Sequence, residues 1–377
     1  MDFRSYAVET NGAIALETPA SVSSAHKASS RSTTPIRELG INFNHWYAVA
    51  RSSEVADQPV SVELWQQAIV LYRDSQQQVR ALEDRCPHRH VKLHHGSIAG
   101  DNLQCAYHGW CFDAEGQCSH VPYLEEKQKL PSCTIRSYPV RERDGFVWVF
   151  PGDRELSDRV EPMPLPEWDH LNYIGSVALI DCEAHFSFLI ENLMDMYHGH
   201  LHDDYQAWAD PVLDTLVTDG DRVDARYQAQ SYYRIDKIWS VSQLFFPRLR
   251  KLHPEILNVS YVYPNWTSTL GRDFKIYCLF SPVSPTHTRA FLIHFTSLHA
   301  FHRLHKLPVA FRRWVKNSLF GSARGLLDGL VEQDVVMVEE EQQAYLANPT
   351  RRPHELNRAL ASVQRLIRQQ AESEDDC

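Results

Sequence analysis

Residues 86–110 read CPHRHVKLHHGSIAGDNLQCAYHGW, and this stretch contains two pairs of cysteine and histidine. Cys86 and His88 form the first pair, with one residue between them, and Cys105 and His108 form the second, with two. Two thiolates and two neutral imidazoles are the ligands of a [2Fe–2S] cluster in which the cysteines bind one iron and the histidines the other. The spacing therefore predicts such a cluster, held by two short loops.

A structural zinc site with two cysteines and two histidines is the other interpretation of these four residues. Zinc sites of that type normally leave two to four residues between paired ligands, whereas one residue separates Cys86 from His88. The spacing therefore favours the cluster. We interpret His94 and His95, which lie between the two pairs, as ordinary loop and surface histidines.

A second group of possible metal ligands occurs at residues 191–203, ENLMDMYHGHLHD. On a helix, His198 and His202 would lie four residues apart on one face. Asp195 would lie one turn before His198, where it could accept a hydrogen bond from that imidazole and fix its tautomer. Two histidines and a carboxylate are typical of a non-heme Fe(II) site that activates O2.

Both groups resemble one family, the Rieske non-heme iron oxygenases. The resemblance rests on CPHR at 86–89, YHGW at 107–110 and DAEGQC at 113–118 for the cluster domain, and on N-x-x-D-x-x-H at 192–198 for the catalytic domain. It implies a [2Fe–2S] cluster and a separate mononuclear Fe(II), with O2 as co-substrate. Asp334, in the stretch EQDVVMVEEEQ at 332–342, takes the place of the third iron ligand. By chemistry alone, Glu332, Glu339, Glu340 and Glu341 are rivals for that place.

The chain departs from the family pattern at three places. His90 stands where the family usually has Gly, and Ala106 where it has Pro. The second iron histidine usually follows the first after four intervening residues, which here is Asp203. His202 comes one residue early and is our preferred ligand, with His200 and Asp203 as alternatives.

The resemblance also implies partners and a reaction. Electrons would come from NAD(P)H through a separate reductase or ferredoxin, since the sequence contains no flavin or dinucleotide motif. The reaction would hydroxylate or oxidatively demethylate a small, cyclic organic substrate. Asp195 would lie on the electron path, and a homotrimer would bring His108 of one chain to Asp195 of the next. The alternative is an electron-transfer Rieske protein whose second domain only binds a partner.

Aromatic and histidine side chains of the second half are candidates for the substrate pocket, although each is commonly a plain core residue. They are Trp208, Trp266, Phe280, His294 and Phe295.

Composition limits the class of protein. The chain has 377 residues, a formal charge of −10, 43% hydrophobic and 23% charged residues, as expected for a globular protein without a nucleic-acid partner. No run of 18 apolar residues occurs, so no membrane span is expected. No signal peptide begins the chain, and the eight cysteines are expected to be free, in the reducing cytoplasm.

The pattern of elements predicts an α+β protein in two domains. An all-β Rieske domain is expected at 41–152, with strands at 67–72, 79–83 and 145–150, and a catalytic domain with an antiparallel sheet flanked by helices at 171–350. A disordered tail (1–40), a linker (153–170) and a C-terminal helix and tail (351–377) complete the division. The catalytic domain is expected to have strands at 226–235, 256–263, 274–280 and 290–298, and helices at 186–202 and 307–343, with a further helix at 353–371.

Overall fold

The computed structural model describes residues 34–125, 127–202, 208–231, 252–300, 304–321 and 324–375. In the N-terminal half, short antiparallel strands form three small sheets. Their orders are β1 (Tyr47–Arg51), β10 (Phe146–Val149) and β9 (Val140–Arg143); β2 (Val60–Leu64), β3 (Gln67–Arg73) and β4 (Val79–Glu83); and β5 (Ser97–Ala99), β6 (Asn102–Gln104), β7 (Cys111–Phe112) and β8 (Cys118–His120). The expected all-β half is therefore present.

A tight turn between β9 and β10 shows why the sequence folds as it does here. Asp144 and Gly145 both have positive φ, 51° and 76°, as a two-residue hairpin turn requires. A Cβ at position 145 would lie 2.2 Å from the Trp168 ring, so only glycine fits. The turn thus fixes the last hairpin of this half against the segment that follows it.

The C-terminal half contains one seven-stranded sheet in which neighbouring strands are antiparallel. Its order is β11 (Tyr173–Cys182), β17 (His287–Ser297), β16 (Phe274–Ser284), β15 (Asn265–Leu270), β14 (His253–Val262), β13 (Arg222–Ser231) and β12 (Trp208–Asp219). The sequence predicted four of these strands to within a few residues and missed β11, β12 and β15. β12 is an edge strand with mostly exposed or half-buried residues, so it lacks the apolar pattern that marks a buried strand.

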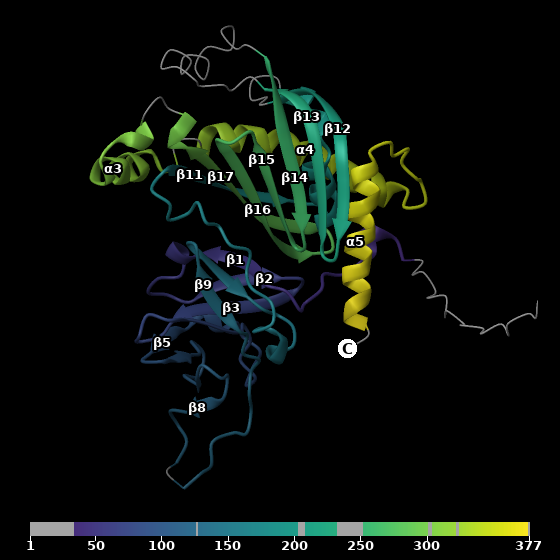
Figure 1. Ribbon diagram of the computed structural model, residues 1–377. Helices are drawn as coiled ribbons and strands as arrows, with labels where there is room; N and C mark the ends of the chain where they lie inside the picture. Colours follow the sequence, from purple (N-terminus) through teal and green to yellow (C-terminus); the bar gives the residue numbers. More distant parts are fainter. Residues whose placement is uncertain are drawn as a thin grey trace, which may run out of the picture. The chain divides into compact units, whose positions relative to one another are not determined.

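Helices α1 (Phe186–Met194), α4 (Arg324–Ala347) and α5 (Arg358–Asp375) pack on the sheet and on one another, and α3 (Val309–Leu319) packs on β11. Figure 1 shows α4 running along the sheet and α5 beside the β12 and β13 edge. Two of the predicted helices are shorter than expected. The one at 186–202 ends at Met194 because Asp195 is extended (φ −92°, ψ 100°), and the chain continues as a 3-10 helix, η5 (Met196–Leu201). The one at 307–343 is divided after Leu319 by an extended Phe320 and by Gly321 at φ 79°.

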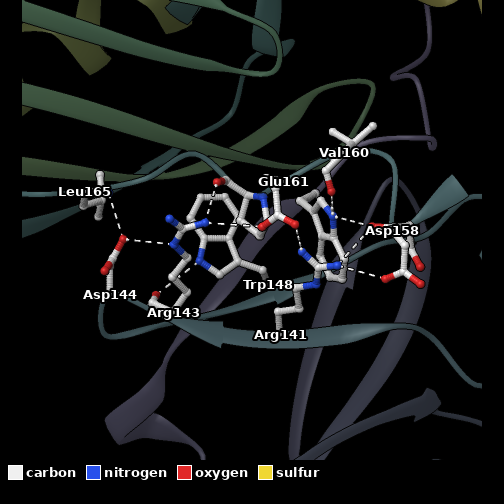
Figure 2. A network of polar contacts seen from close by, with 11 residues as sticks. Arg141, Arg143, Asp144, Trp148, Asp158, Val160, Glu161 and Leu165 are labelled. Atoms are coloured by element: carbon white, nitrogen blue, oxygen red, sulfur yellow. Dashed lines mark hydrogen bonds and ion pairs between the residues drawn. The ribbon is translucent and has the colours of Figure 1, made fainter.

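The predicted linker makes polar contacts with both halves of the protein. Arg141 of β9 contacts Asp158 at 3.0 Å and Glu161 at 2.6 Å, as Figure 2 shows. Glu167 is buried and accepts hydrogen bonds from Lys275 at 2.6 Å and Tyr277 at 2.8 Å, both on β16. The segment therefore connects the last strands of the first half to the large sheet.

The end of the predicted tail also has structure. Ile36–Glu38 form a 3-10 helix, η1, and Leu39 is buried. Arg37 contacts the buried Glu191 of α1 at 2.7 Å and lies over the Phe188 ring. Ordered packing thus begins before position 41, while residues 1–33 lie outside the described part. Among the described residues, no helix is both long and apolar enough to cross a membrane.

Candidate metal centres

The two predicted cluster loops have the same backbone geometry. The Cys86 amide donates to the Val91 carbonyl at 2.9 Å, and the Cys105 amide donates to the Trp110 carbonyl at 2.8 Å. Each cysteine carbonyl accepts from the amide four residues later, His90 at 2.8 Å and Gly109 at 3.0 Å. Each loop is therefore closed on itself by two hydrogen bonds, which holds its Cys and His in fixed relation.

These bonds require a left-handed residue at the fourth position after each cysteine. Gly109 has φ 70° and His90 has φ 57°. Glycine adopts this conformation without steric cost, whereas a residue with a Cβ does not. At position 90 the chain therefore keeps the left-handed backbone, but it has His in place of the Gly that adopts this conformation without steric cost.

In the predicted cluster site the two thiols lie next to each other, and so do the two imidazoles. Cys86 and Cys105 are buried, at 1% and 2% exposure, and their thiols lie beside each other. Burial raises the pKa of Cys86 to about 11, so a bound metal is needed to hold these thiols as thiolates. The rings of His88 and His108 are 4.5 Å apart, and His88 stacks on Trp110 at 4.7 Å. Nδ1 of His88 is buried without a hydrogen-bond partner, so the residues fit a cluster with sulfur ligands on one side and nitrogen ligands on the other.

The second group converges from η5, the residue that follows it, and α4. Ligand atoms of His198, His202 and Asp334 lie within 4.8 Å of one another, the only such group of three or more that the described residues form. Nε2 of His198 is 3.6 Å and Nε2 of His202 is 3.4 Å from Oδ1 of Asp334. His198 and His202 do not share an α-helix, because α1 ends before them, but η5 still brings their rings within 5.3 Å.

Hydrogen bonds prepare this group for a cation. Nδ1 of His202 lies 2.9 Å from Oε1 of Gln333, and an amide oxygen only accepts, so Nδ1 carries the proton and Nε2 presents its lone pair. His202 Nε2 and His198 Nδ1 are buried without a hydrogen-bond partner. Burial lowers the pKa of His198, against the opposing effect of Asp334, which favours the neutral form that binds metal. These residues fit a mononuclear iron of the two-histidine, one-carboxylate type.

The rival ligands lie elsewhere or cannot be placed. Glu332, Glu340 and Glu341 are exposed, and Glu339 accepts a hydrogen bond from the Glu183 amide. None of these four belongs to the group. The His200 side chain and Asp203 fall outside what the structure describes, so the choice of His202 over them stays a prediction.

Asp195 has different partners from those expected. Its Oδ1 accepts hydrogen bonds from the Tyr197 amide and from Nδ2 of Asn357, each at 3.0 Å, while no hydrogen bond joins its carboxylate to the His198 ring. Asn357 is buried, and its Oδ1 accepts from the Ala359 amide at the start of α5. Neither Gln333 nor Asn357 was predicted from the sequence. The first adjoins a predicted ligand, but nothing in the local sequence pairs position 357 with 195.

Of the five predicted pocket residues, Trp208 lies nearest the second group. Its ring centroid is 6.3 Å from those of His198 and His202, and its indole donates to the Met196 carbonyl at 3.0 Å. Trp266 and Phe280 are buried in the main core, whereas Phe295 belongs to a second core, with Trp148 and Leu165. Half-buried His294 stacks on Phe274.

The surface of the described part of the chain includes pockets of about 350 and 330 Å³. One is lined by residues such as Gln67, Arg85 and Arg136, and the other by residues such as Val212 and Gln230. Neither includes a predicted pocket residue or a metal donor, so the pocket assignment stays a prediction.

Comparison with known proteins points to one family. The Rieske [2Fe-2S] domain family matches residues 45–139. A 4beta-methylsterol monooxygenase of Methylococcus capsulatus is 31% identical over 339 residues, which cover 88% of this chain and 89% of that protein. The oxygenase component of dicamba O-demethylase from Stenotrophomonas maltophilia is 36% identical over 41% of this chain, but the match spans only 46% of that relative. In structure, dicamba monooxygenase bound to 3,6-dichlorosalicylic acid has a TM-score of 0.72, with 90% of this chain and 100% of that chain covered at 21% identity.

The structural likeness shows the shared fold, and the match along nearly the whole length to the methylsterol monooxygenase shows the relationship. Both predicted donor sets occur in the structure, as a pair of cluster loops and a three-residue group. The chain belongs to the Rieske non-heme iron oxygenases, enzymes that carry a Rieske [2Fe–2S] cluster and a mononuclear iron.

Proposed function

We propose that this chain is an oxygenase component that uses O2, and electrons from a separate NAD(P)H-dependent reductase or ferredoxin, to oxidise a small cyclic substrate in the cytoplasm. The observation that carries the proposal is the convergence of His198, His202 and Asp334 on one point. A pure electron carrier would have no use for this second group.

The proposal assigns a role to each donor. Cys86, His88, Cys105 and His108 would hold the cluster, and His198, His202 and Asp334 the mononuclear iron. When bound, the cluster supplies single electrons and the iron binds and activates O2. Around the iron site, Gln333 fixes the tautomer of His202, and Trp208 covers both imidazoles with an apolar wall.

The substrate class follows from the relatives. Similarity to the methylsterol monooxygenase extends over 88% of the chain, whereas similarity to the dicamba and vanillate O-demethylases covers 41%. We therefore propose hydroxylation of a methyl group on an apolar, polycyclic substrate of sterol type, with oxidative O-demethylation of a methoxyarene as the second candidate.

Two measurements test this function. Purified protein should contain three iron atoms per chain, whereas the alternative electron carrier would contain two. With a reconstituted reductase, a 4-methylsterol should give a product 16 mass units heavier, and 18 mass units heavier when the O2 is labelled with 18O. Two irons per chain would refute the oxygenase, and three irons with turnover of a methoxyarene alone would favour the second candidate.

We also propose a homotrimer in which cluster and iron sites of different chains cooperate. Tyr107, which lies against His108, is 62% exposed, and Tyr123, which accepts a hydrogen bond from Trp110, is 59% exposed. Tyr197, close to Asp195 in the chain, is also exposed. Surfaces of this kind are typical of contacts between subunits.

Mixed oligomers test the cooperation. Cys105→Ala leaves the iron ligands intact, and Asp334→Ala leaves the cluster ligands intact, so each variant alone should be inactive. Co-expressed in one oligomer, they should recover part of the wild-type rate. Inactive mixed oligomers, with composition verified by mass, would contradict cooperation between chains but not the oxygenase assignment.

A further inference from the structure

Helix α3 and the residue after it expose an unusual concentration of large apolar side chains. Val309, Phe311, Trp314, Leu319 and Phe320 are each at least 41% exposed, and Trp314 is 61% exposed. The rings of Phe311 and Trp314 lie 5.4 Å apart, on the outward side of the helix. Apolar side chains gathered in this way on a surface commonly mark an interaction site.

The inward side of α3 is fixed, so these residues are not a disordered edge. Val315 is buried with Ile174 and Leu298 in a small core. Arg312 donates to the Asn172 side chain, and Lys316 donates to the Trp168 carbonyl. With Val315, Arg312 and Lys316 facing the protein, Trp314 lies on the opposite side of the helix, and Phe311, 43% exposed, lies at the edge of that side.

The sequence around the helix has charges of one sign, and the acidic side chain that acts on α3 from elsewhere, Asp169, lies near the inward-facing Lys316. No Asp or Glu occurs between positions 274 and 327, although the chain has 48 acidic residues and a formal charge of −10. Lys306 and Arg313 are exposed beside the aromatic side chains. Tryptophan and phenylalanine flanked by basic residues are typical of a helix that lies in the interface of an anionic membrane.

We propose that α3 docks this enzyme on the surface of an anionic lipid bilayer. The helix would lie in the plane of the interface, with Trp314 and Phe311 among the acyl chains and Lys306 and Arg313 at the headgroups. Docking itself does not depend on the proposed function. It would also deliver an apolar substrate from the bilayer, and that part rests on the proposed function.

The position of α3 suits such delivery. Gly321 donates to the Gly175 carbonyl at 2.9 Å, which ties the end of the docking segment to β11, and α4 begins at Arg324. Asp334 is ten residues further along α4, which is about 15 Å along a helix axis. A sterol is of comparable length, so a substrate leaving the membrane at α3 would have a short path to the iron site.

Flotation of the full-length holoenzyme with vesicles tests the docking without any turnover. Wild-type protein should float with vesicles that contain phosphatidylglycerol and much less with pure phosphatidylcholine. Phe311→Ser with Trp314→Ser should reduce binding at least tenfold, and Lys306→Gln with Arg313→Gln should reduce it in low salt. The matched control is Val212→Ser with Val217→Ser, which removes two exposed apolar side chains from β12 and should leave binding unchanged.

The cluster absorbance and the melting temperature show whether each variant is folded. Absence of wild-type binding to anionic vesicles, or equal loss in the β12 control, would overturn the proposal. Loss of oligomeric mass in the Phe311/Trp314 variant, without vesicle binding by the wild type, would assign the surface to a second copy of the chain. Loss of reduction by the electron donor, again without vesicle binding, would assign it to that donor.

If substrate delivery is also correct, the Phe311/Trp314 variant should have a lower kcat/KM for vesicle-embedded substrate and an unchanged value for detergent-dispersed substrate. Equal loss with both would overturn delivery. An enzyme without activity on either would contradict the proposed function, while flotation would still decide docking.

Discussion

The cluster loops take their four donors from residues 86–108, whereas the mononuclear group takes three donors from positions 198, 202 and 334. Each cluster loop is closed by hydrogen bonds within six consecutive residues. The mononuclear group instead depends on contacts between distant elements, including Gln333 of α4 and Asn357 at the start of α5. One site is therefore built locally and the other by the tertiary fold.

This difference predicts how each site responds to amino-acid substitutions. A local site should fail alone when a ligand is removed, because its loops are closed by hydrogen bonds of their own. A site assembled from distant elements should be sensitive to residues that never touch the metal.

Removing a cluster ligand should abolish the cluster and leave the rest of the protein intact. In Cys86→Ala or His108→Ala, one of only four ligands is lost, so visible absorbance should disappear while the chain still folds. Iron analysis should find about one atom per chain, the mononuclear iron. Retained colour in either variant would refute the cluster assignment, and loss of the remaining iron as well would show that the two sites are not independent.

Removing an iron histidine should have the opposite effect, with the cluster retained and the mononuclear iron lost. His198→Ala and His202→Ala should keep the cluster absorbance, lose one iron per chain and lose turnover. His200→Ala, the matched control from the same segment, should retain iron. If His200→Ala lost iron while His202→Ala remained active, our choice between the two histidines would be wrong.

The same contrast explains what could be predicted from sequence. Cysteine and histidine spacing was sufficient for the cluster loops, because a local structure is encoded in adjacent residues. The mononuclear group was approached through helical periodicity, which fails at Asp195, where α1 has already ended. Asp334 could be proposed only from the family resemblance, and Asn357 could not be proposed at all. A hydrogen bond between positions 195 and 357 leaves no periodic pattern in a single sequence.

Substitution of Asn357 tests whether the mononuclear group depends on a residue that is distant in the sequence. Its Oδ1 caps α5 while its Nδ2 donates to Asp195. Asn357→Asp keeps the cap, since Asp caps helices as well as Asn, but removes the donor and places two carboxylates together. We expect the melting temperature to change little and the rate of cluster reoxidation by O2 with substrate to fall roughly 10- to 100-fold.

The pH dependence separates this effect from simple structural damage. Two adjacent carboxylates raise the pKa of one of them, and the protonated carboxyl can again donate to its neighbour. Reoxidation in Asn357→Asp should therefore recover as the pH falls, whereas Asn357→Ser, which caps but cannot donate at that distance, should remain slow. An Asn357→Asp enzyme with a normal rate at neutral pH would show that Asp195 does not need this partner.

The smallest effect is expected where the two cluster loops differ from each other, at His90 and Gly109. Both positions have the same left-handed backbone, with φ 57° and 70°. His90→Gly removes a Cβ that disfavours this conformation by about 1–2 kcal/mol, but it also increases the entropy of the unfolded chain by an amount worth about 0.5–1 kcal/mol. The holoenzyme should therefore become more stable by no more than about 1.5 kcal/mol. The exchange at Gly109 should have the opposite sign, because a new Cβ would be strained and would lie 2.8 Å from Cγ of Pro122. We expect Gly109→Ala to lower the free energy of unfolding by about 1–3 kcal/mol. Denaturant unfolding monitored by cluster absorbance measures both changes, and equal signs for the two would show that the loops, despite their matching hydrogen bonds, are not energetically equivalent.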